Sequence, residues 1–356
     1  MLKRTLPLLL ALLLLLCGCG KTEAPSEPPT TAPTTEAPTT APTTEPTEAA
    51  RMYRNPLNGQ WLEAPHTGRA TGVMFNNIEF AMPLCGITEA DIVFEALADC
   101  CNATRMEGIF SDISQAPRLG SIRSSRPYFV SICRAFDALY VHFGGSTEAR
   151  DLLASLGYDR MDGLVYDGVY YYRDQDRLNA GYASEHTAFT TGETIAQFTR
   201  DKGISMDREE EVSYGLTFDD GKLTGGSPAT NFTVYFGDYG KSTGFVYDEE
   251  TGLYGASQFG GPILDGNNDQ QLSFRNLILL HCPVYPQPDM YRMTMELVGE
   301  GRADLVRDGQ VVSICWSRES EDSPFVFTYE DGTPASLGVG HTYVAILPLD
   351  AEFDIQ

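Results

Sequence analysis

Residues 118–146 read RLGSIRSSRPYFVSICRAFDALYVHFGGS, and this stretch indicates both a fold and a site. We expect Pro127 to open a helix, because the N–H that proline lacks would be unpaired at the first helical position anyway. The apolar residues that follow have the spacing of a helix lying on a core: Phe129, Ile132, Cys133 and Phe136. The run Leu139–Phe143 then predicts a buried strand, which ends at Gly144-Gly145-Ser146.

Two arginines, Arg123 and Arg126, stand immediately before this helix. Guanidinium groups beside the free N–H groups and positive dipole end of a helix form a natural site for an anion. Arg105, in a preceding apolar run, is a third candidate for the same site. The alternative is a structural role, in which the arginines pair with nearby carboxylates: Asp91, Glu95 or Asp112. The sequence leaves both interpretations open.

Histidines and carboxylates supply the other candidates for chemistry. His142 ends an apolar run and is either a core histidine or a ligand-binding residue, whereas His186 lies in a polar loop, where a general base could stand. Asp91 and Glu95 are four residues apart on a predicted strand, which puts them on one face and about 13 Å apart. That separation is too large for two carboxylates that act together as a catalytic pair. Each of the two remains a possible catalytic residue by itself.

The N-terminus predicts a lipoprotein leader over residues 1–18. Lys3 and Arg4 precede the apolar core Leu8–Leu16, which is too short for a membrane-spanning helix. Leu16-Cys17-Gly18-Cys19 matches a bacterial lipobox, so Cys19 is the expected lipid-modified first residue of the mature protein. This pattern predicts an extracytoplasmic protein anchored to the bilayer through acylated Cys19.

Residues 19–50 form the predicted tether, with APTTEAPTTAPTTEPTEAA as its clearest repeat. Thr, Pro, Glu and Ala cannot bury a core, so we expect a disordered segment. Its prolines favour an extended form of about 3.1 Å per residue, which gives a reach of roughly 90 Å. Such a tether suits a Gram-positive envelope, where it would lift a folded domain into the wall.

Charge and composition restrict the partners. The formal net charge of −24 argues against nucleic acid, so a phosphate site must be a local exception in an acidic protein. No Cys-x-x-Cys pair with zinc spacing is present and the five histidines are scattered, so we predict no metal site. No cofactor is evident from the sequence.

The fold class expected from the order of apolar runs is α+β. Strands at Thr71–Asn76, Asp91–Ala96 and Arg105–Ser111 precede the arginine-flanked helix, and helices are predicted from Ser146 to Leu156 and from Thr190 to Lys202. Residues 51–205 are therefore predicted to form an α/β domain. After Gly203 short β-rich runs alternate with turn signals, so residues 206–356 are predicted to form a mainly β domain. We predict two units. The sequence leaves open whether the second half is a separate domain or a sheet packed on the first half.

Several long motifs in order resemble the DUF3048 family of YerB-like lipoproteins. They include Ile87–Ala96, Thr104-Arg105, Gly120–Phe129, Tyr140–Ser146 and, further along, Gly299–Gly301, Asp308-Gly309 and Trp316. The resemblance covers nearly all of the exported part, from Asn55 onward, and implies an N-terminal and a C-terminal family domain. It implies no biochemical function.

A second resemblance concerns the order of elements. A strand, an acidic strand, a strand and an arginine loop are similar to the core of the LytR-CpsA-Psr phosphotransferases, which hold a polyprenyl pyrophosphate with arginines. Two functions are therefore expected as alternatives. The first is a lipoprotein that binds an anionic envelope polymer or an envelope protein through its arginines. The second is a phosphotransferase or hydrolase on polyprenyl-phosphate-linked polymers, in which Arg105, Arg123 and Arg126 clamp phosphate and Asp91 or His186 assists.

Overall fold

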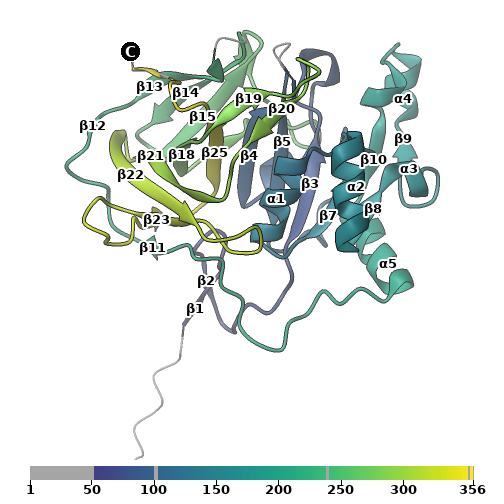
Figure 1. Cartoon of the computed structure of the whole chain (residues 1–356), viewed down its shortest axis with the longest axis horizontal. Helices are drawn as coiled ribbons and strands as arrows, with labels where there is room; N and C mark the ends of the chain where they lie inside the picture. Colours follow the sequence, from purple (N-terminus) through teal and green to yellow (C-terminus); the bar gives the residue numbers. More distant parts are fainter. Residues whose placement is uncertain (1–51, 100–102, 238–239, 352, 356) are drawn as a thin grey trace, which may run out of the picture. The chain divides into compact units, whose positions relative to one another are not determined.

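The computed structural model describes residues 52–99, 103–237, 240–351 and 353–355 (Figure 1). The predicted leader, the tether and Cys19 lie outside the described residues. From Ala50 to Gln356 the chain forms one compact unit. No helix in the described ranges combines the length and apolar composition needed to cross a membrane.

The largest sheet has eleven strands in the described part of the chain. In spatial order they are β12 (Ser227–Pro228), β22 (Gln310–Arg318), β21 (Gly299–Arg307), β18 (Asn276–His281), β25 (Thr342–Leu347), β4 (Ile92–Leu97), β5 (Thr104–Phe110), β3 (Thr71–Phe75), β7 (Leu139–His142) and β8 (Arg160–Asp162), with β23 (Val326–Thr328) beside β22. β25 pairs in parallel with β4 on one side and with β18 on the other. Strands from both predicted domains therefore share one sheet, and the predicted boundary at residues 205–206 does not divide it.

A second sheet packs on one face of the first. It contains β16 (Gly261–Pro262), β15 (Leu253–Gln258), β14 (Ser242–Asp248), β13 (Asn231–Tyr235) and β26 (Phe353–Ile355), with β17 (Ser273–Phe274) beside β15. The rings of Phe245 in β14 and Tyr343 in β25 lie 4.9 Å apart between the two sheets. Smaller sheets are formed by β1 (Tyr53–Arg54) with β2 (Trp61–Leu62), by β6 (Leu119–Gly120), β10 (Ala188–Thr190) and β9 (Tyr172–Arg173), by β11 (Phe218–Asp219) with β24 (Leu337–Gly338), and by β19 (Val284–Pro286) with β20 (Met293–Met295).

All described helices precede Gly203. They are α1 (Pro127–Ala135), α2 (Thr147–Leu156), α3 (Gly163–Tyr166), α4 (Gln175–Asn179) and α5 (Gly192–Lys202), with 3-10 turns at Glu79–Ala81, Ile87–Glu89 and Ser184–His186. The later half contains strands and loops wherever the structure describes it, which agrees with the predicted mainly β character. The α+β class is thus confirmed in its coarse form, with strands in the majority.

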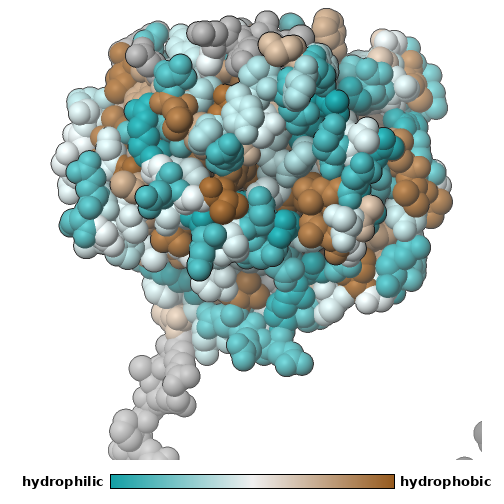
Figure 2. Space-filling model, viewed as in Figure 1, coloured by the Kyte–Doolittle hydropathy of each residue, from teal (hydrophilic) through white to brown (hydrophobic). Residues whose placement is uncertain are grey.

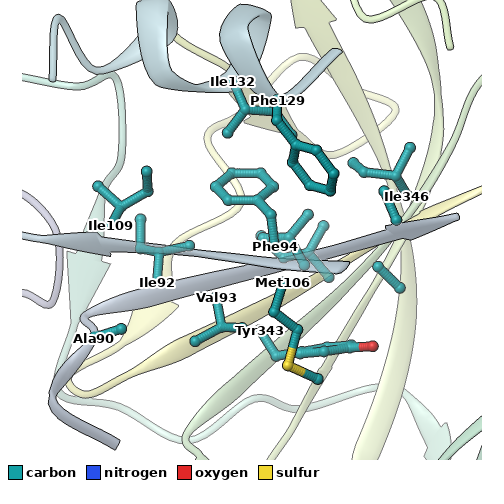
Figure 3. Packing of buried hydrophobic residues seen from close by; sticks show 14 of the residues in the cluster. Ala90, Ile92, Val93, Phe94, Met106, Ile109, Phe129, Ile132, Tyr343 and Ile346 are labelled. Carbon is teal, nitrogen blue, oxygen red and sulfur yellow. The ribbon is translucent and has the colours of Figure 1, made fainter. Parts of the chain in front are cut away.

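Helix α1 begins at Pro127, as predicted, and packs its apolar stripe on the sheet. Figure 3 shows Phe129 and Ile132 pointing from α1 toward Phe94 of β4, while Val93 and Tyr343 lie on the opposite side of the strands. The side chains of Phe129 and Ile132 are completely buried. The predicted spacing therefore identified the face of α1 that forms the core.

The helix ends follow from their capping residues. The Oγ of Ser146 accepts a hydrogen bond from the N–H of Ala149, and α2 ends at Gly157 with a positive φ of 60°, as predicted. For α5 the capping residue is Thr191, whose Oγ1 accepts from the N–H of Thr194. The predicted start at Thr190 is thus one residue early, because the side chain of Thr190 instead donates to the carbonyl of Tyr170.

A buried carboxyl group, Glu107 in β5, lies between the sheet and Cys133 of α1. The side chain is completely buried, and neither oxygen has a hydrogen-bond partner among the described residues. Burial raises the pKa of Glu107 well above its usual range, so the folded protein holds this group protonated. In the unfolded chain it is ionised above pH ~4.5. The folded state therefore binds more protons, and this group reduces stability increasingly as pH rises toward its folded pKa.

We therefore predict that Glu107→Met stabilises the protein at neutral pH by about 3 kcal/mol, because it removes a buried polar group that has no partner and that must take up a proton on folding. The difference from the wild type should be small at pH 4 and grow by up to ~1.4 kcal/mol per pH unit above pH 5. Urea unfolding of both proteins between pH 4 and 8 measures it. A difference that stays constant with pH would show that Glu107 is not held protonated.

Candidate anion-binding site

The candidate site lies at the carboxyl ends of parallel strands. β7 runs parallel to both β3 and β8, so their last residues meet at one edge of the sheet. The segment that contains Arg123 crosses this edge: the N–H of Arg123 donates to the carbonyl of Met74 at 3.1 Å, and the N–H of Ser125 donates to the carbonyl of Gly144 at 2.9 Å. Ligands in open α/β sheets usually bind at this edge.

A pocket of about 310 Å³ opens beside this segment. Its lining comes from the arginine segment, the turn after β7, the start of α3, β9 and the turn before β10: Ile122, Arg123, Ser124, Phe143, Gly144, Gly145, Leu164, Arg173, Ser184, Glu185 and Ala188. Its volume lies within the usual range for small-molecule pockets, ~300–1,000 Å³. The lining therefore combines two arginines and one glutamate with apolar residues.

The two lining arginines differ in how their charges are balanced. Both Nε and Nη2 of Arg173 donate to Asp167, at 3.1 and 2.7 Å, and its Nη1 donates to the carbonyl of Ser184 at 2.8 Å. Arg123 is paired more loosely, with 3.8 Å between its Nη2 and Oε1 of Glu185. The side chain of Glu185 is half exposed, so it can turn into solvent and leave Arg123 to an incoming anion.

Two further arginines lie behind the pocket wall. Arg105 donates from Nη1 to the carbonyl of Ser124, and Arg126 donates from Nη1 to the carbonyl of Ser125. Their exposed fractions are only 7% and 8%, and the Nε of Arg126 has no hydrogen-bond partner in the part of the chain that the structure describes. No carboxylate of a described residue lies within 4.0 Å of either guanidinium. Buried charges are normally paired, and here the buried carboxylate of Asp99 acts on Arg105 only from a distance, so the two guanidinium groups are incompletely balanced beside the pocket.

The arginines also affect one another. Burial, followed by the charge of Arg126, lowers the pKa of Arg105 to about 9, so that its guanidinium remains protonated at neutral pH. Burial lowers the pKa of Arg123 as well, with Glu185 acting against this change and Arg126 adding to it. A bound anion would relieve this repulsion, because it interacts favourably with all three charges.

One carboxylate, Asp162 at the end of β8, holds the pocket wall together. Its Oδ1 accepts from the N–H of Gly144 at 2.8 Å and from the N–H of Leu164 at 3.0 Å. His142, at the end of β7, is completely buried, and its Nδ1 lies 2.8 Å from the carbonyl oxygen of Gly144. Burial lowers the pKa of His142, and Asp162 offsets this only in part. His142 therefore supports the turn at Gly144 and does not itself line the pocket.

His186 belongs to the same region. It follows Ser184 and Glu185, which line the pocket, but its ring is buried and its Nδ1 lies 2.8 Å from Nδ2 of Asn76. Burial, followed by the positive charge of Arg123, lowers the pKa of His186. The structure thus brings His186 close to the arginines in its neutral form.

The two predicted carboxylates lie elsewhere. Asp91 precedes β4 and accepts hydrogen bonds from Asn58 and from the N–H of Ser111. Arg105 pairs with Ala96 at the other end of β4, so Asp91 lies about 16 Å from the arginines along the strand. Asp91 is therefore too far from the arginines to assist in a reaction at a phosphate bound by them, which contradicts this part of the predicted enzyme mechanism.

Glu95 is completely buried on the face of the sheet that meets the second sheet. Its oxygens accept hydrogen bonds from five side chains: Asn77, Thr104, Thr243, Gln258 and Tyr343. The last three belong to the later half of the chain. The predicted structural pairing of the arginines with Asp91, Glu95 or Asp112 is therefore wrong, because the first two bind other donors and Asp112 accepts from the N–H of Ser114.

Three parts of the candidate site were not predicted from the sequence. Arg173, Leu164 and Asp162 come from a region without a family motif or a long periodic run, and they join the pocket only because β8 and β9 lie beside β7 and β10. The one local signal was Asp162 before Gly163, since aspartate is a favoured residue at the start of a helix. No group of three or more His, Cys, Asp or Glu side chains within the described ranges could hold a metal ion.

The fold and site define a β-rich α+β protein with an arginine-lined pocket at the carboxyl edge of its sheet. The chain belongs to the DUF3048 family: the N-terminal domain model of this protein family of unknown function matches residues 57–205, and the C-terminal domain model matches residues 232–344. The chain is 29% identical over 313 residues to "Putative lipoprotein YerB" of Bacillus subtilis (strain 168), which covers 85% of this chain and 89% of that protein.

A crystal structure of the YerB protein from Bacillus subtilis matches the fold with a TM-score of 0.73 and 27% sequence identity. The match covers 85% of this chain and 99% of the crystallised chain. The family resemblance predicted from the motifs is therefore confirmed.

Proposed function

We propose that this protein is a lipid-anchored extracytoplasmic lipoprotein that binds a phosphate-bearing anion of the cell envelope in the pocket lined by Arg123 and Arg173. The observation that carries the proposal is the pair of buried arginines behind the pocket, Arg105 and Arg126, which lack a carboxylate within 4.0 Å among the described residues. In a protein with a net charge of −24, a cluster of positive charge at the carboxyl edge of a sheet favours anion binding.

The anion would interact with the protein in two ways. Arg123 and Arg173 lie in the pocket wall and would donate charge-assisted hydrogen bonds to phosphate oxygens. Arg105 and Arg126 hold the carbonyl groups of Ser124 and Ser125 and would add long-range attraction through their charges. This division separates residues that contact the ligand from residues that favour its charge.

Calorimetric titration tests the binding. The compact unit Ala50–Gln356 contains every described helix and strand, so the chain from Ala50 onward is a suitable soluble protein. We expect pyrophosphate to bind and Arg123→Gln to weaken binding by about tenfold or more, since a charge-assisted hydrogen bond is lost. Arg200→Gln is the matched control, because Arg200 is exposed on α5 and does not line the pocket. Equal affinity in all three proteins, or no binding of pyrophosphate, would contradict the proposal.

Lipid anchoring is tested separately. Support comes from Leu16-Cys17-Gly18-Cys19 and from the similarity to a protein whose name describes a lipoprotein. We predict that cells labelled with radioactive palmitate incorporate the label into the wild type and into Cys17→Ser, but not into Cys19→Ser. Lipid attachment needs the thiol of the first mature residue, and Cys17 serves as the matched control. Label retained by Cys19→Ser would exclude Cys19 as the anchor.

A further inference from the structure

We infer that the anion bound by this pocket is the head group of an amphiphile, a phosphate that carries a hydrocarbon chain. The inference rests on the proposed function and goes further, because it names the chemical class of the ligand. Three features of the described residues support it: the mixed lining of the pocket, the exposed apolar side chains beside it, and the way in which α3 is fixed against it.

The pocket is not a purely polar phosphate site. Beside the two arginines its lining contains four apolar residues: Ile122 and Ala188, which are buried, and Phe143 and Leu164, which remain partly or largely exposed. A free phosphate or pyrophosphate would leave the exposed side chain of Leu164 in water. A ligand with a charged and an apolar part fits both portions of the wall. Its phosphate would form hydrogen bonds with Arg123 and Arg173, and its hydrocarbon would cover the apolar residues and so leave water.

The apolar lining continues onto the surface of the molecule. Leu164, Val165 and Val169 have exposed fractions of 60%, 67% and 68%. Figure 2 shows hydrophobic residues gathered at the right-hand edge of the view, where Figure 1 places α3, while much of the remaining surface in this view is hydrophilic. Single exposed apolar side chains are common, but a group beside a pocket indicates a binding surface.

This surface is fixed in place and does not belong to a free loop. Asp162 binds the N–H groups of both Gly144 and Leu164, which ties the start of α3 to the pocket turn. A Cβ atom on Gly163 would lie only 2.0 Å from the ring of Phe143, so glycine is required for α3 to approach the pocket this closely. The apolar wall and the arginines are therefore held together before any ligand arrives.

The charge of the protein favours a single amphiphile over a bilayer as the occupant. A net charge of −24 opposes docking of the whole molecule on an anionic membrane surface. A phosphate head group enters the pocket as an individual molecule, whereas a flat bilayer would have to approach the acidic surface as well. We therefore assign the site to one phosphate-bearing amphiphile taken up singly.

The experiment compares pyrophosphate, farnesyl pyrophosphate and farnesol by calorimetry with the chain from Ala50 onward. Each methylene group that leaves water contributes a factor of about four to affinity, so partial burial of the farnesyl chain should strengthen binding about tenfold or more over pyrophosphate. Val165→Asn should remove much of that gain and leave the affinity for pyrophosphate unchanged, because Val165 is 67% exposed beside the pocket but does not line it. Val326→Asn is the matched control, because Val326 is also exposed but lies on β23 and outside the pocket.

The outcomes separate this inference from the proposed function. Equal binding of pyrophosphate and farnesyl pyrophosphate, with both lost in Arg123→Gln, would overturn the amphiphile and leave the anion site standing. No binding of either phosphate would overturn both. Binding to vesicles of phosphatidylglycerol without binding of monomeric farnesyl pyrophosphate would overturn the assignment of a single amphiphile as the occupant.

Discussion

Glu95→Ala should lower the free energy of unfolding by about 3–5 kcal/mol, because it removes the one acceptor that five buried donors share. The carboxylate oxygens of Glu95 accept from Asn77 and Thr104 in the first half of the chain and from Thr243, Gln258 and Tyr343 in the second. Without the carboxylate these donors stay buried and lose this acceptor, although Asn77 and Gln258 keep hydrogen bonds to the hydroxyl oxygens of Thr104 and Thr243.

A buried lysine adds to the loss. Lys241 is only 5% exposed and donates from Nζ to Oε1 of Gln258 at 2.7 Å. Burial lowers the pKa of Lys241, while the charge of Glu95 acts to raise it. Removal of Glu95 therefore leaves a buried ammonium group without its neighbouring negative charge, which is costly in a medium of low polarity.

Urea unfolding at neutral pH measures the effect, with Glu330→Ala as the control. Glu330 is exposed, so its replacement should change stability by less than about 0.5 kcal/mol. Because Glu95 joins both halves, the wild type should unfold in a single transition that has the same midpoint by tryptophan fluorescence and by far-UV circular dichroism. A change in stability no larger than that of the control would show that the cluster around Glu95 does not hold the two sheets together.

Arg105→Met should stabilise the protein in the absence of an anion and weaken anion binding. The guanidinium of Arg105 is buried beside Arg126, and burial followed by this neighbour lowers its pKa to about 9. It remains charged at neutral pH, so the folded state retains the cost of the buried charge. Replacement by an apolar side chain of similar length should raise the free energy of unfolding by about 1–3 kcal/mol.

The same change should weaken pyrophosphate binding by about five- to tenfold, because a positive charge near the pocket contributes on the order of 1 kcal/mol. Arg134→Met is the control, since Arg134 forms its ion pairs with Glu321 and Asp322. That variant should lose some stability and keep its anion affinity. A less stable Arg105→Met protein with unchanged affinity would show that Arg105 serves only to hold the carbonyl of Ser124.

The local elements could be predicted from sequence because local signals determine them. Pro127 and the apolar spacing after it identified α1, and Ser146 with Gly157 identified both ends of α2. The way in which the two halves are joined was harder to predict. β25 pairs with β4 across about 250 positions of the sequence, and no local pattern identifies a strand's partner at that distance. The apolar run Thr342–Leu347 indicated a buried strand but not which strands lie beside it.

The residues of the candidate pocket were predicted only in part for the same reason. Arg105, Arg123 and Arg126 were predicted as candidates because two of them adjoin a helix start, and in the structure their charges act on one another. Arg173 and Leu164 come from a segment whose place is decided by tertiary packing, so they were not recognised. Glu95 was interpreted as a possible catalytic residue, since an acidic residue in an apolar strand does not show whether it faces solvent or a buried set of donors.

The most direct test of the anion site is an anomalous difference map from crystals grown with tungstate, a heavy oxyanion of phosphate-like shape. We expect one strong peak in the 310 Å³ pocket, within hydrogen-bonding distance of the guanidinium groups of Arg123 and Arg173. The peak should disappear in crystals of Arg123→Gln. An empty pocket, with tungstate bound elsewhere or not at all, would contradict the account.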